Sequence, residues 1–362
     1  MDDKGYMRTA LQMAEATKGQ TTPNPAVGAV VVKEHRVVGF GAHLRAGEAH
    51  AERHALTMAG EKAYDATIYV TLEPCSHQGR TPPCCDAIIE AGIRRVVVAT
   101  MDANPKVAGN GIKKLRQAGI EVDVGVCREA AEELNQSFFH YMKTNQPYVT
   151  LKVAASIDGK IATSTGESQW ITSSESRADG HVLRHQHDAI LVGVNTVVAD
   201  DPKLTTRLPE GGENPIRVIL DHTLRTPLSA QLVTDKSAPT WIVTTKKADA
   251  HRIDEFEKNG VSVLVLKGET IEVDELLVQL SERGVTSVLV EGGGTIHDAF
   301  LRSGSFQQIV YYMAVMLIGG SHAPDAFSGM GISSLKDVPR LAVHSWEKLG
   351  SDMKMVLRKG EE

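Results

Sequence analysis

HAERHA … TLEPCSHQGRTPPCC, residues 50–85, is the stretch that decides the fold of this chain. His50, Cys75 and Cys84 offer one imidazole and two thiolates, the ligands that zinc prefers, and three protein ligands leave a fourth position open. Zinc lowers the pKa of a water at such an open position to near neutrality and so supplies a nucleophile. Glu52 follows His50 closely and is a candidate proton shuttle. The stretch therefore predicts a catalytic zinc site.

A closed structural zinc site with four protein ligands is the alternative. His54 lies four residues after His50 and reaches the same helical face, and His77 and Cys85 are also near in sequence. Such a site would leave the acid at position 52 without a role, so we favour the catalytic site. Between the adjacent thiols we choose Cys84, because it shares a helical face with apolar residues, and we expect Cys85 to pack. We expect Cys127 to be a lone buried thiol.

Composition, net charge and cysteine content favour some classes of protein and argue against others. The length of 362 residues allows two domains, and 42% hydrophobic with 23% charged residues is typical of a soluble globular protein. The net charge of −6 argues against a polynucleotide partner but not against a small phosphorylated substrate. No apolar run is long enough for a membrane span, and MDDKGYMRTA is not typical of a signal peptide. Clustered cysteines indicate metal chemistry in a reducing compartment, so we expect a cytoplasmic protein.

Strands alternate with helices in the first part of the chain, which predicts an α/β layered domain with a largely parallel sheet. An acidic helix and a polar turn containing Pro147 follow at residues 127–148, so we place the domain boundary at about residue 146. Expected elements are a helix at 4–18, a hairpin at 26–43, helices at 48–60, 85–93 and 111–120, and strands at 66–74, 94–100 and 121–126.

A second alternating series begins at residue 148. VEGGGT at 290–295 is a strand running into glycines and a helix, a turn that suits a diphosphate but lacks the GxGxxG pattern. Expected elements are a strand and turn at 148–162, strands at 215–221, 240–245, 261–267, 286–290 and 308–320, a strand with a loop at 188–200, and helices at 173–187, 271–284 and 296–304.

HAE … EPCSHxGxTPPC resembles the deaminase half of the bifunctional riboflavin-pathway deaminase/reductase. LKVAASIDGKIA, GESQWITS, VGVNTVVADDPKLTTR and LVEGGGT resemble, in that order, its reductase half, so the resemblance spans nearly the whole chain. It implies a cytidine-deaminase-like three-layer domain at 1–146 and a dihydrofolate-reductase-like domain that uses NADPH at 147–362. It also implies zinc-dependent hydrolytic deamination of 2,5-diamino-6-(5-phosphoribosylamino)pyrimidin-4-one. NADPH-dependent reduction of the ribosyl group of 5-amino-6-(5-phosphoribosylamino)uracil to ribityl would follow.

The resemblance also implies roles for single residues. Asn24 and His43 match positions near the pyrimidine, and His77, Arg80 and Thr81 offer groups for the phosphate. Cofactor positions are matched by Ala154, Trp170, Thr196, Asp200, His222, Gly293, Gly294 and Thr295, although the family usually has a small hydroxyl residue where His222 stands. Positions that hold the sugar phosphate are matched by Ser168, Arg184, Leu204, Arg207 and Glu291.

Two questions stay open from the residues alone: the role of Lys152 and the choice between rival functions. Lys152, which we place at a strand end, would protonate the ribose carbonyl oxygen as hydride arrives, or would simply face solvent. The rival functions are a nucleoside or nucleic-acid base deaminase whose second domain only binds, and a zinc-stapled nucleotide-binding module without catalysis. As partners we expect small phosphoribosyl pyrimidines and further copies of the chain, in a dimer or tetramer, but no nucleic acid and no membrane.

Overall fold

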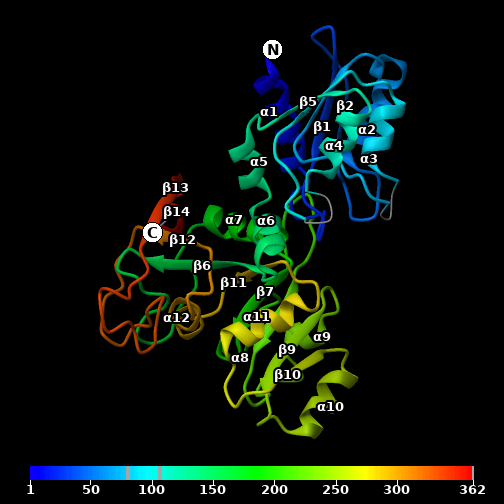
Figure 1. Cartoon of the computed structure of the whole chain (residues 1–362). Helices are drawn as coiled ribbons and strands as arrows, with labels where there is room; N and C mark the ends of the chain where they lie inside the picture. The colour runs from blue at the N-terminus through cyan, green and yellow to red at the C-terminus, as the bar shows by residue number, and fades with distance from the viewer. Residues whose placement is uncertain (79–81, 105–107, 361–362) are drawn as a thin grey trace. The chain divides into compact units, whose positions relative to one another are not determined.

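The computed structural model of the chain describes residues 1–78, 82–104 and 108–360 (Figure 1). It divides into two compact units, Met1–Asn145 and Gln146–Glu362. In the described part, no helix has both the length and the apolar character needed to cross a membrane.

The first unit is built on a five-stranded sheet in the order β2-β1-β3-β4-β5. The hairpin of β1 and β2 is antiparallel, and β1 also runs antiparallel to β3, whereas β3, β4 and β5 are parallel. The expectation of a largely parallel sheet is therefore wrong for this unit, because the predicted hairpin joins the same sheet. The strands are β1 (Gly28–Lys33), β2 (Arg36–Ala42), β3 (Thr67–Val70), β4 (Arg95–Val98) and β5 (Glu121–Val124).

Helices cover both faces of this sheet, which confirms the three-layer arrangement. Alternation along β1 divides its side chains, so that Ala29 and Val31 pack with α2, α3 and α4, while Val30 and Val32 pack with α1 and α5. The helices are α1 (Asp3–Glu15), α2 (Ala51–Ala59), α3 (Cys84–Glu90), α4 (Asn110–Gln117), α5 (Arg128–Leu134) and α6 (Gln136–Thr144), with a 3-10 turn η1 (Gly60–Ala63).

The single acidic helix expected at 127–148 is two helices. The break falls at Asn135, whose side-chain Oδ1 accepts from the backbone N–H of Ala26 and whose Nδ2 donates to the carbonyl of Ala26, both at 2.8 Å. These two long-range hydrogen bonds fix Asn135 between α5 and α6 and end α5. Cys127 is also only half-buried, at the start of α5, rather than fully buried.

The second unit is built on a nine-stranded sheet in the order β10-β9-β8-β7-β11-β6-β12-β14-β13. Neighbours are parallel from β10 through β12, and the last two strands are antiparallel. Parallel strands covered on both faces read as continuous apolar runs, as in the fully buried AILVG of β7. The strands are β6 (Tyr148–Ser156), β7 (Ala189–Gly193), β8 (Ile216–Leu220), β9 (Thr240–Thr245), β10 (Ser262–Leu266), β11 (Ser287–Val290), β12 (Gln308–Ala314), β13 (Leu341–Leu349) and β14 (Asp352–Lys359).

Helices lie on both faces of the second sheet as well. Side chains of α11 and α12 share one core with alternate residues of the central strands, and α8, α9 and α10 share another core on the opposite face. The helix expected at 173–187 is present as α7. The helices are α7 (Ser174–His185), α8 (Val194–Asp200), α9 (Gln231–Thr234), α10 (Ala250–Lys258), α11 (Val273–Ser281) and α12 (Gly294–Ser303).

Two expectations about this unit are corrected, and one hairpin was missed. The loop expected after β7 is the helix α8, because Val194 and Val197, three residues apart, both pack in the core. The apolar strand expected at 308–320 ends at Ala314, and the following Val315 and Leu317 are exposed. The hairpin of β13 and β14 was not expected at all.

Candidate functional site

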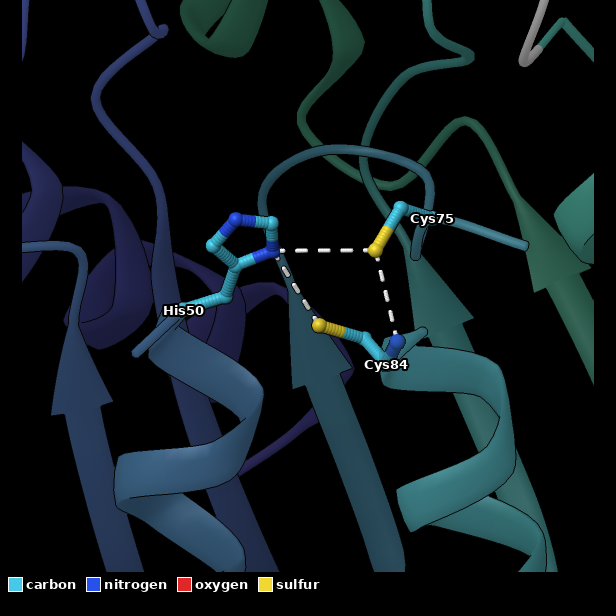
Figure 2. A group of neighbouring side chains, drawn as sticks. All are labelled: His50, Cys75 and Cys84. Atoms are coloured by element: carbon cyan, nitrogen blue, oxygen red, sulfur yellow. Dashed lines mark hydrogen bonds between the residues drawn. The ribbon is translucent and has the colours of Figure 1, made fainter. Parts of the chain in front are cut away.

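Three metal-binding side chains meet at the carboxyl end of β3. His50 is the N-terminal cap of α2, Cys84 is the first residue of α3, and Cys75 lies in the turn after β3. Nδ1 of His50 lies 3.6 Å from Sγ of Cys75 and 3.3 Å from Sγ of Cys84 (Figure 2). The backbone N–H of Cys84 donates to Sγ of Cys75 at 3.3 Å. The ligand atoms of all three lie within 4.8 Å of one another.

This donor set fits zinc. Bonds of about 2.3 Å to sulfur and about 2.0–2.1 Å to nitrogen at tetrahedral angles would put nitrogen and sulfur roughly 3.6 Å apart. The two distances from Nδ1 of His50 agree with that separation to a few tenths of an ångström. Among the described residues, the cluster has three members, and His54, His77 and Cys85 do not belong to it. A three-ligand site keeps one position open for water.

Electrostatics within the cluster favour ionisation of one of its two thiols, because the hydrogen bond with Cys75 raises the pKa of Cys84 whereas the pKa of Cys75 is lowered. Hydrogen bonds from Cys84 and His50 hold the pKa of Cys75 well below its usual range, so this thiol ionises readily. The hydrogen bond with Cys75 raises the pKa of His50. Burial raises the pKa of Glu52 to about 6, and the negative charge of Cys75 acts in the same direction. Glu52 lies in the first turn of α2 with its side chain buried, so it can change its proton inside the site.

A cavity of about 390 Å³ opens beside the cluster. Nε2 of His43 lies 3.1 Å from Nδ2 of Asn24, and Nδ1 of His43 lies 3.3 Å from the carbonyl oxygen of Ala49. Burial lowers the pKa of His43, which keeps its imidazole neutral near pH 7. The cavity is lined by His50, Glu52, Cys75 and the predicted Asn24, His43 and His77, and also by Glu73, Asp102, Asn104 and Phe138.

The remaining predictions at this site have different outcomes. Cys85 points away from the cluster, with Sγ donating to the carbonyl of Pro74 at 3.3 Å, and packs in the core. Arg80 and Thr81 lie outside the described residues. Glu73, Asp102 and Asn104 were missed. Glu73 directly precedes Pro74 and Cys75, and this position beside a metal ligand was the signal that could have identified it. The sequence pattern places Glu73 only at the end of an expected strand.

A second cluster of charges lies at the carboxyl edge of the larger sheet. Nε of Arg184 on α7 donates to Oε1 of Glu291 at 2.7 Å, and Nη2 donates to Oε2 at 2.9 Å. Nζ of Lys152 on β6 lies 3.8 Å from the same carboxylate. Burial alone would raise the pKa of Glu291, but the charges of Arg184 and Lys152 outweigh it and hold the pKa at about 2. The carboxylate is therefore ionised and fixed between two cations.

The glycine turn follows β11 directly at this edge. A Cβ on Gly293 would meet no atom within 4 Å, so its backbone faces open space, as a ligand-binding turn requires. A Cβ on Gly294 would lie 2.3 Å from the carbonyl oxygen of Asp325, so only glycine fits there. Because β6, β7 and β11 are parallel neighbours, residues at their carboxyl ends share one edge of the sheet. Ala154 on β6, Thr196 and Asp200 on α8, and Thr295 on α12 belong to the elements that meet there.

Other predicted residues of this unit sit differently from what their roles suggest. The side chain of Leu204 is buried in the core at a positive φ of 53°, so only its backbone can face a ligand. His222 is exposed, and its carbonyl accepts from Thr244 and Thr245 at 3.1 Å. Ser168 and Trp170 lie in the loop before α7, where the guanidinium of Arg177 stands 4.4 Å from the Trp170 ring centroid.

Lys152 is not at a strand end but is the fifth residue of β6. The strand continues because β12 pairs with it as far as Ser156, whereas β11 stops pairing at Leu151. Lys152 therefore lies just beyond the end of β11, beside Glu291. Arg184 is likewise not an open fork for phosphate, because its Nε and Nη2 already bind Glu291 and its Nη1 donates to the carbonyl of Thr205 at 3.1 Å.

Comparison with known proteins gives a family match for each unit. Residues 1–100 match the family model described as the cytidine and deoxycytidylate deaminase zinc-binding region, and residues 147–355 match the RibD C-terminal domain. The fold and the metal cluster thus define a zinc-binding deaminase-type domain joined to a RibD-type C-terminal domain. The chain belongs to the riboflavin biosynthesis protein RibD family.

Individual relatives cover nearly the whole chain. It is 51% identical to the riboflavin biosynthesis protein RibD of Bacillus amyloliquefaciens, over 97% of this chain and 94% of that one. It is 49% identical to that of Aquifex aeolicus, over 97% of each. Among solved structures, a RibD from Acinetobacter baumannii superposes with a TM-score of 0.90 at 37% identity, over 99% of each chain. A Thermotoga maritima protein described as a diaminohydroxyphosphoribosylaminopyrimidine deaminase/5-amino-6-(5-phosphoribosylamino)uracil reductase gives 0.88 at 36% identity, over 99% of each.

Proposed function

We propose that the chain is a bifunctional enzyme of riboflavin biosynthesis with one reaction in each unit. Residues 1–146 hydrolyse the 2-amino group of 2,5-diamino-6-(5-phosphoribosylamino)pyrimidin-4-one and release ammonia. Residues 147–362 then reduce the ribosyl group of 5-amino-6-(5-phosphoribosylamino)uracil to ribityl with NADPH. The observation that carries the proposal is the His50–Cys75–Cys84 cluster, which opens with a buried Glu52 into a cavity.

In the first reaction, His50, Cys75 and Cys84 hold the zinc, which activates the attacking water when bound. Glu52 accepts the proton that this water loses and delivers it to the departing amine, so that ammonia leaves and a ring carbonyl remains. Burial suits Glu52 to both steps, because its raised pKa brings the carboxyl closer to neutral pH.

Asn24 and His43 hold the pyrimidine in this proposal. A carbonyl can only accept, so Nδ1 of His43 carries the proton toward Ala49, and we assign Nε2 as the acceptor for the Nδ2–H of Asn24. The amide oxygen of Asn24 is then left to accept from the N–H groups of the ring. His77, together with Arg80 and Thr81, would bind the phosphate.

In the second reaction, the turn of Gly293, Gly294 and Thr295 holds the diphosphate of NADPH at the start of α12. In this proposal hydride adds to C1′ of the ribose while the bond from C1′ to the ring oxygen breaks, and Lys152 gives a proton to that oxygen, which becomes a ribityl hydroxyl. Glu291 keeps the Lys152 ammonium at this edge of the sheet. The remaining cofactor positions are Ala154, Trp170, Thr196, Asp200 and His222. The substrate positions are Ser168, Arg207 and the backbone of Leu204, while Arg184 and Glu291 bind each other.

The two rival functions are less well supported. A closed zinc staple would need a fourth protein ligand and gives no reason to bury Glu52 in the same cavity. A polynucleotide deaminase would need basic surface that a net charge of −6 does not favour. Incubation with the diaminopyrimidine, with and without NADPH, separates all three functions. We expect ammonia in both reactions and the ribityl product only with NADPH; no ammonia from the zinc-loaded protein would contradict the proposal.

We further propose that the protein works in the cytoplasm as a homo-oligomer, a dimer or tetramer. Four free cysteines suit a reducing compartment. Edge strand β13 is exposed along nearly its whole length, including Val343 and Trp346, and such an edge favours pairing with another copy. Light scattering should give the mass of a dimer or tetramer, and Trp346→Asp should lower it; a monomeric parent would contradict assembly.

A further inference from the structure

Glu73 carries an unusual number of backbone hydrogen bonds for a single side chain. Its Oε2 accepts from the N–H of Asp102 at 3.3 Å and from that of Gly109 at 2.9 Å. Its Oε1 accepts from the N–H of Gly111 at 2.9 Å and from that of Ile112 at 3.3 Å. The side chain is 4% exposed. All four donors belong to the segment between β4 and the first turn of α4.

The two carboxylate oxygens have different tasks. Oε2 binds the N–H groups of Asp102 and Gly109, so one atom joins two points seven positions apart in the chain. Oε1 takes N–H groups that the first turn of a helix leaves without a partner, where a negative charge is also favoured. Glu73 thus joins Asp102, Gly109 and the start of α4 to the turn that carries Cys75.

Close approach of the backbones of Gly111 and Pro74 holds the same segments together. A Cβ on Gly111 would lie 2.1 Å from the carbonyl oxygen of Pro74, so the start of α4 touches the turn that follows β3. That carbonyl also accepts from the Sγ of Cys85 at the start of α3. The metal-bearing turn, α3 and α4 therefore meet at Glu73 and Pro74.

Asp102 and Asn104, next to this anchor point, form a wall of the cavity. Asp102 and Asn104 line the cavity together with Cys75 and Glu73 itself. The N–H of Asn104 donates to Oδ1 of Asp102 at 2.7 Å, which orients the Asp102 side chain within the wall. The position of this wall relative to the metal-bearing turn therefore depends on Glu73, which binds Asp102 in the wall and holds Gly109 and α4 through its other three hydrogen bonds.

We infer that Glu73 is a positioning residue of the deaminase site, which holds the Asp102–Asn104 wall at the distance that the pyrimidine substrate requires. The inference rests on the proposed function. Glu73 contributes to substrate binding through the wall and does not take part in the proton transfers that Glu52 performs. Its loss should therefore change the Michaelis constant for the diaminopyrimidine more than kcat.

Glu73→Gln is the direct test, because a carboxamide has the same shape but turns an NH₂ group toward two of the four donors. We expect roughly a tenfold or larger rise in KM for deamination, less change in kcat, and an unchanged zinc content. Reductase activity of the same preparation is an internal control, since its residues lie in the other unit. Glu132→Gln is a matched control, because Glu132 binds Arg128 and Thr100 and does not line the cavity.

Gly111→Ala gives a second route to the same wall if Glu73→Gln does not fold. It keeps the carboxyl group but pushes α4 away from Pro74, and its Cβ would lie 3.1 Å from Oε1 of Glu73, so it should also raise KM. Substrate titration in a Glu52→Gln background, with and without the second change, measures the binding loss without turnover. An unchanged KM and affinity, or loss of zinc in place of substrate affinity, would overturn the inference. Absence of ammonia from the parent enzyme would instead contradict the proposed function.

Discussion

Arg184 is bound to Glu291 through two parallel hydrogen bonds, at 2.7 Å from Nε and 2.9 Å from Nη2. This geometry uses the Nε–Nη2 edge of the guanidinium that an arginine would otherwise offer to a phosphate. The pair belongs to the protein's own framework and keeps a buried carboxylate ionised beside Lys152. Exposed Arg207, in the loop before β8, is therefore the better candidate for the phosphate of the reductase substrate.

Arg207→Ala should impair reduction by weakening substrate binding while NADPH binding stays nearly intact. Losing one charge-assisted contact costs about 1.5–3 kcal/mol, roughly a ten- to hundredfold rise in KM if binding is uniform. Steady-state kinetics with the ribosyl intermediate varied, beside an NADPH titration, measures both effects. Lys203→Ala is the control, because it removes an exposed charge from the same loop. A loss of NADPH affinity with an unchanged substrate KM would assign Arg207 to the cofactor.

Glu52→Gln should keep zinc and lose deamination, because the amide matches the shape of the acid but cannot carry a proton. General acid–base groups typically contribute about 10²- to 10⁴-fold, and we expect a loss of kcat of that order. Ammonia release, zinc content and reduction of supplied deaminated intermediate are measured on one preparation. Deamination near the parent rate would show that Glu52 is not the shuttle.

Cys84→Ser should lower zinc content far more than Cys85→Ser. A hydroxyl is a poor zinc ligand, and only Sγ of Cys84 faces His50, whereas Sγ of Cys85 faces the carbonyl of Pro74. Metal analysis of the two purified variants decides between them. Equal retention of zinc, or the reverse order, would contradict the ligand assignment.

The second unit should lose stability in acid because of Glu291. Its pKa in the folded protein, about 2, lies below the ordinary 4.5, so the stabilisation is complete above about pH 4.5 and declines as the pH falls through about 2. That shift corresponds to roughly 3 kcal/mol. All three tryptophans, Trp170, Trp241 and Trp346, lie in this unit, so urea unfolding followed by tryptophan fluorescence reports on it alone.

Glu291→Gln is the comparison for this acid response. The variant should be less stable at pH 7, because Arg184 loses its partner, and its stability should fall less between pH 4.5 and 2 than that of the parent. Parallel pH curves for the parent and the variant would show that another group causes the acid response.

Separating the chain after residue 146 should give two folded pieces with separate activities. Each compact unit has its own sheet and its own core clusters. We expect the first piece to bind zinc and release ammonia, and the second to bind NADPH. Zinc analysis and an NADPH titration on the purified pieces check this. Soluble, folded pieces with neither property would contradict independent sites.

The zinc ligands could be predicted from sequence because their chemistry is carried by a few side chains in a short pattern. Glu73 could not be assigned in the same way. Its role depends on backbone N–H groups some thirty to forty positions later, such as that of Gly109, and backbone groups leave no mark on side-chain patterns. The ion pair of Arg184 could not be foreseen for a related reason, since its partner Glu291 lies 107 residues away.

Strongly apolar strands were also predictable, whereas elements fixed by tertiary contacts were not. Thr196, Val197 and Val198 favour extended structure locally, yet they form α8 because Val194 and Val197 reach the core. The break at Asn135 depends on the distant backbone of Ala26. Strand β13 is exposed nearly throughout, so its sequence lacks the alternation of buried and exposed positions that marks a strand.

The two units are parts of one polypeptide, joined at Asn145 and Gln146, and this has a consequence for metabolism. Translation of one message yields both units in equal number, and no separate regulation of synthesis can change that ratio. Under the proposed function, the steady-state amount of the deaminated intermediate is then governed by the relative kinetic constants of the two sites. A substitution that slows only the reductase would let that intermediate accumulate in the cell, even though the amount of enzyme stayed the same.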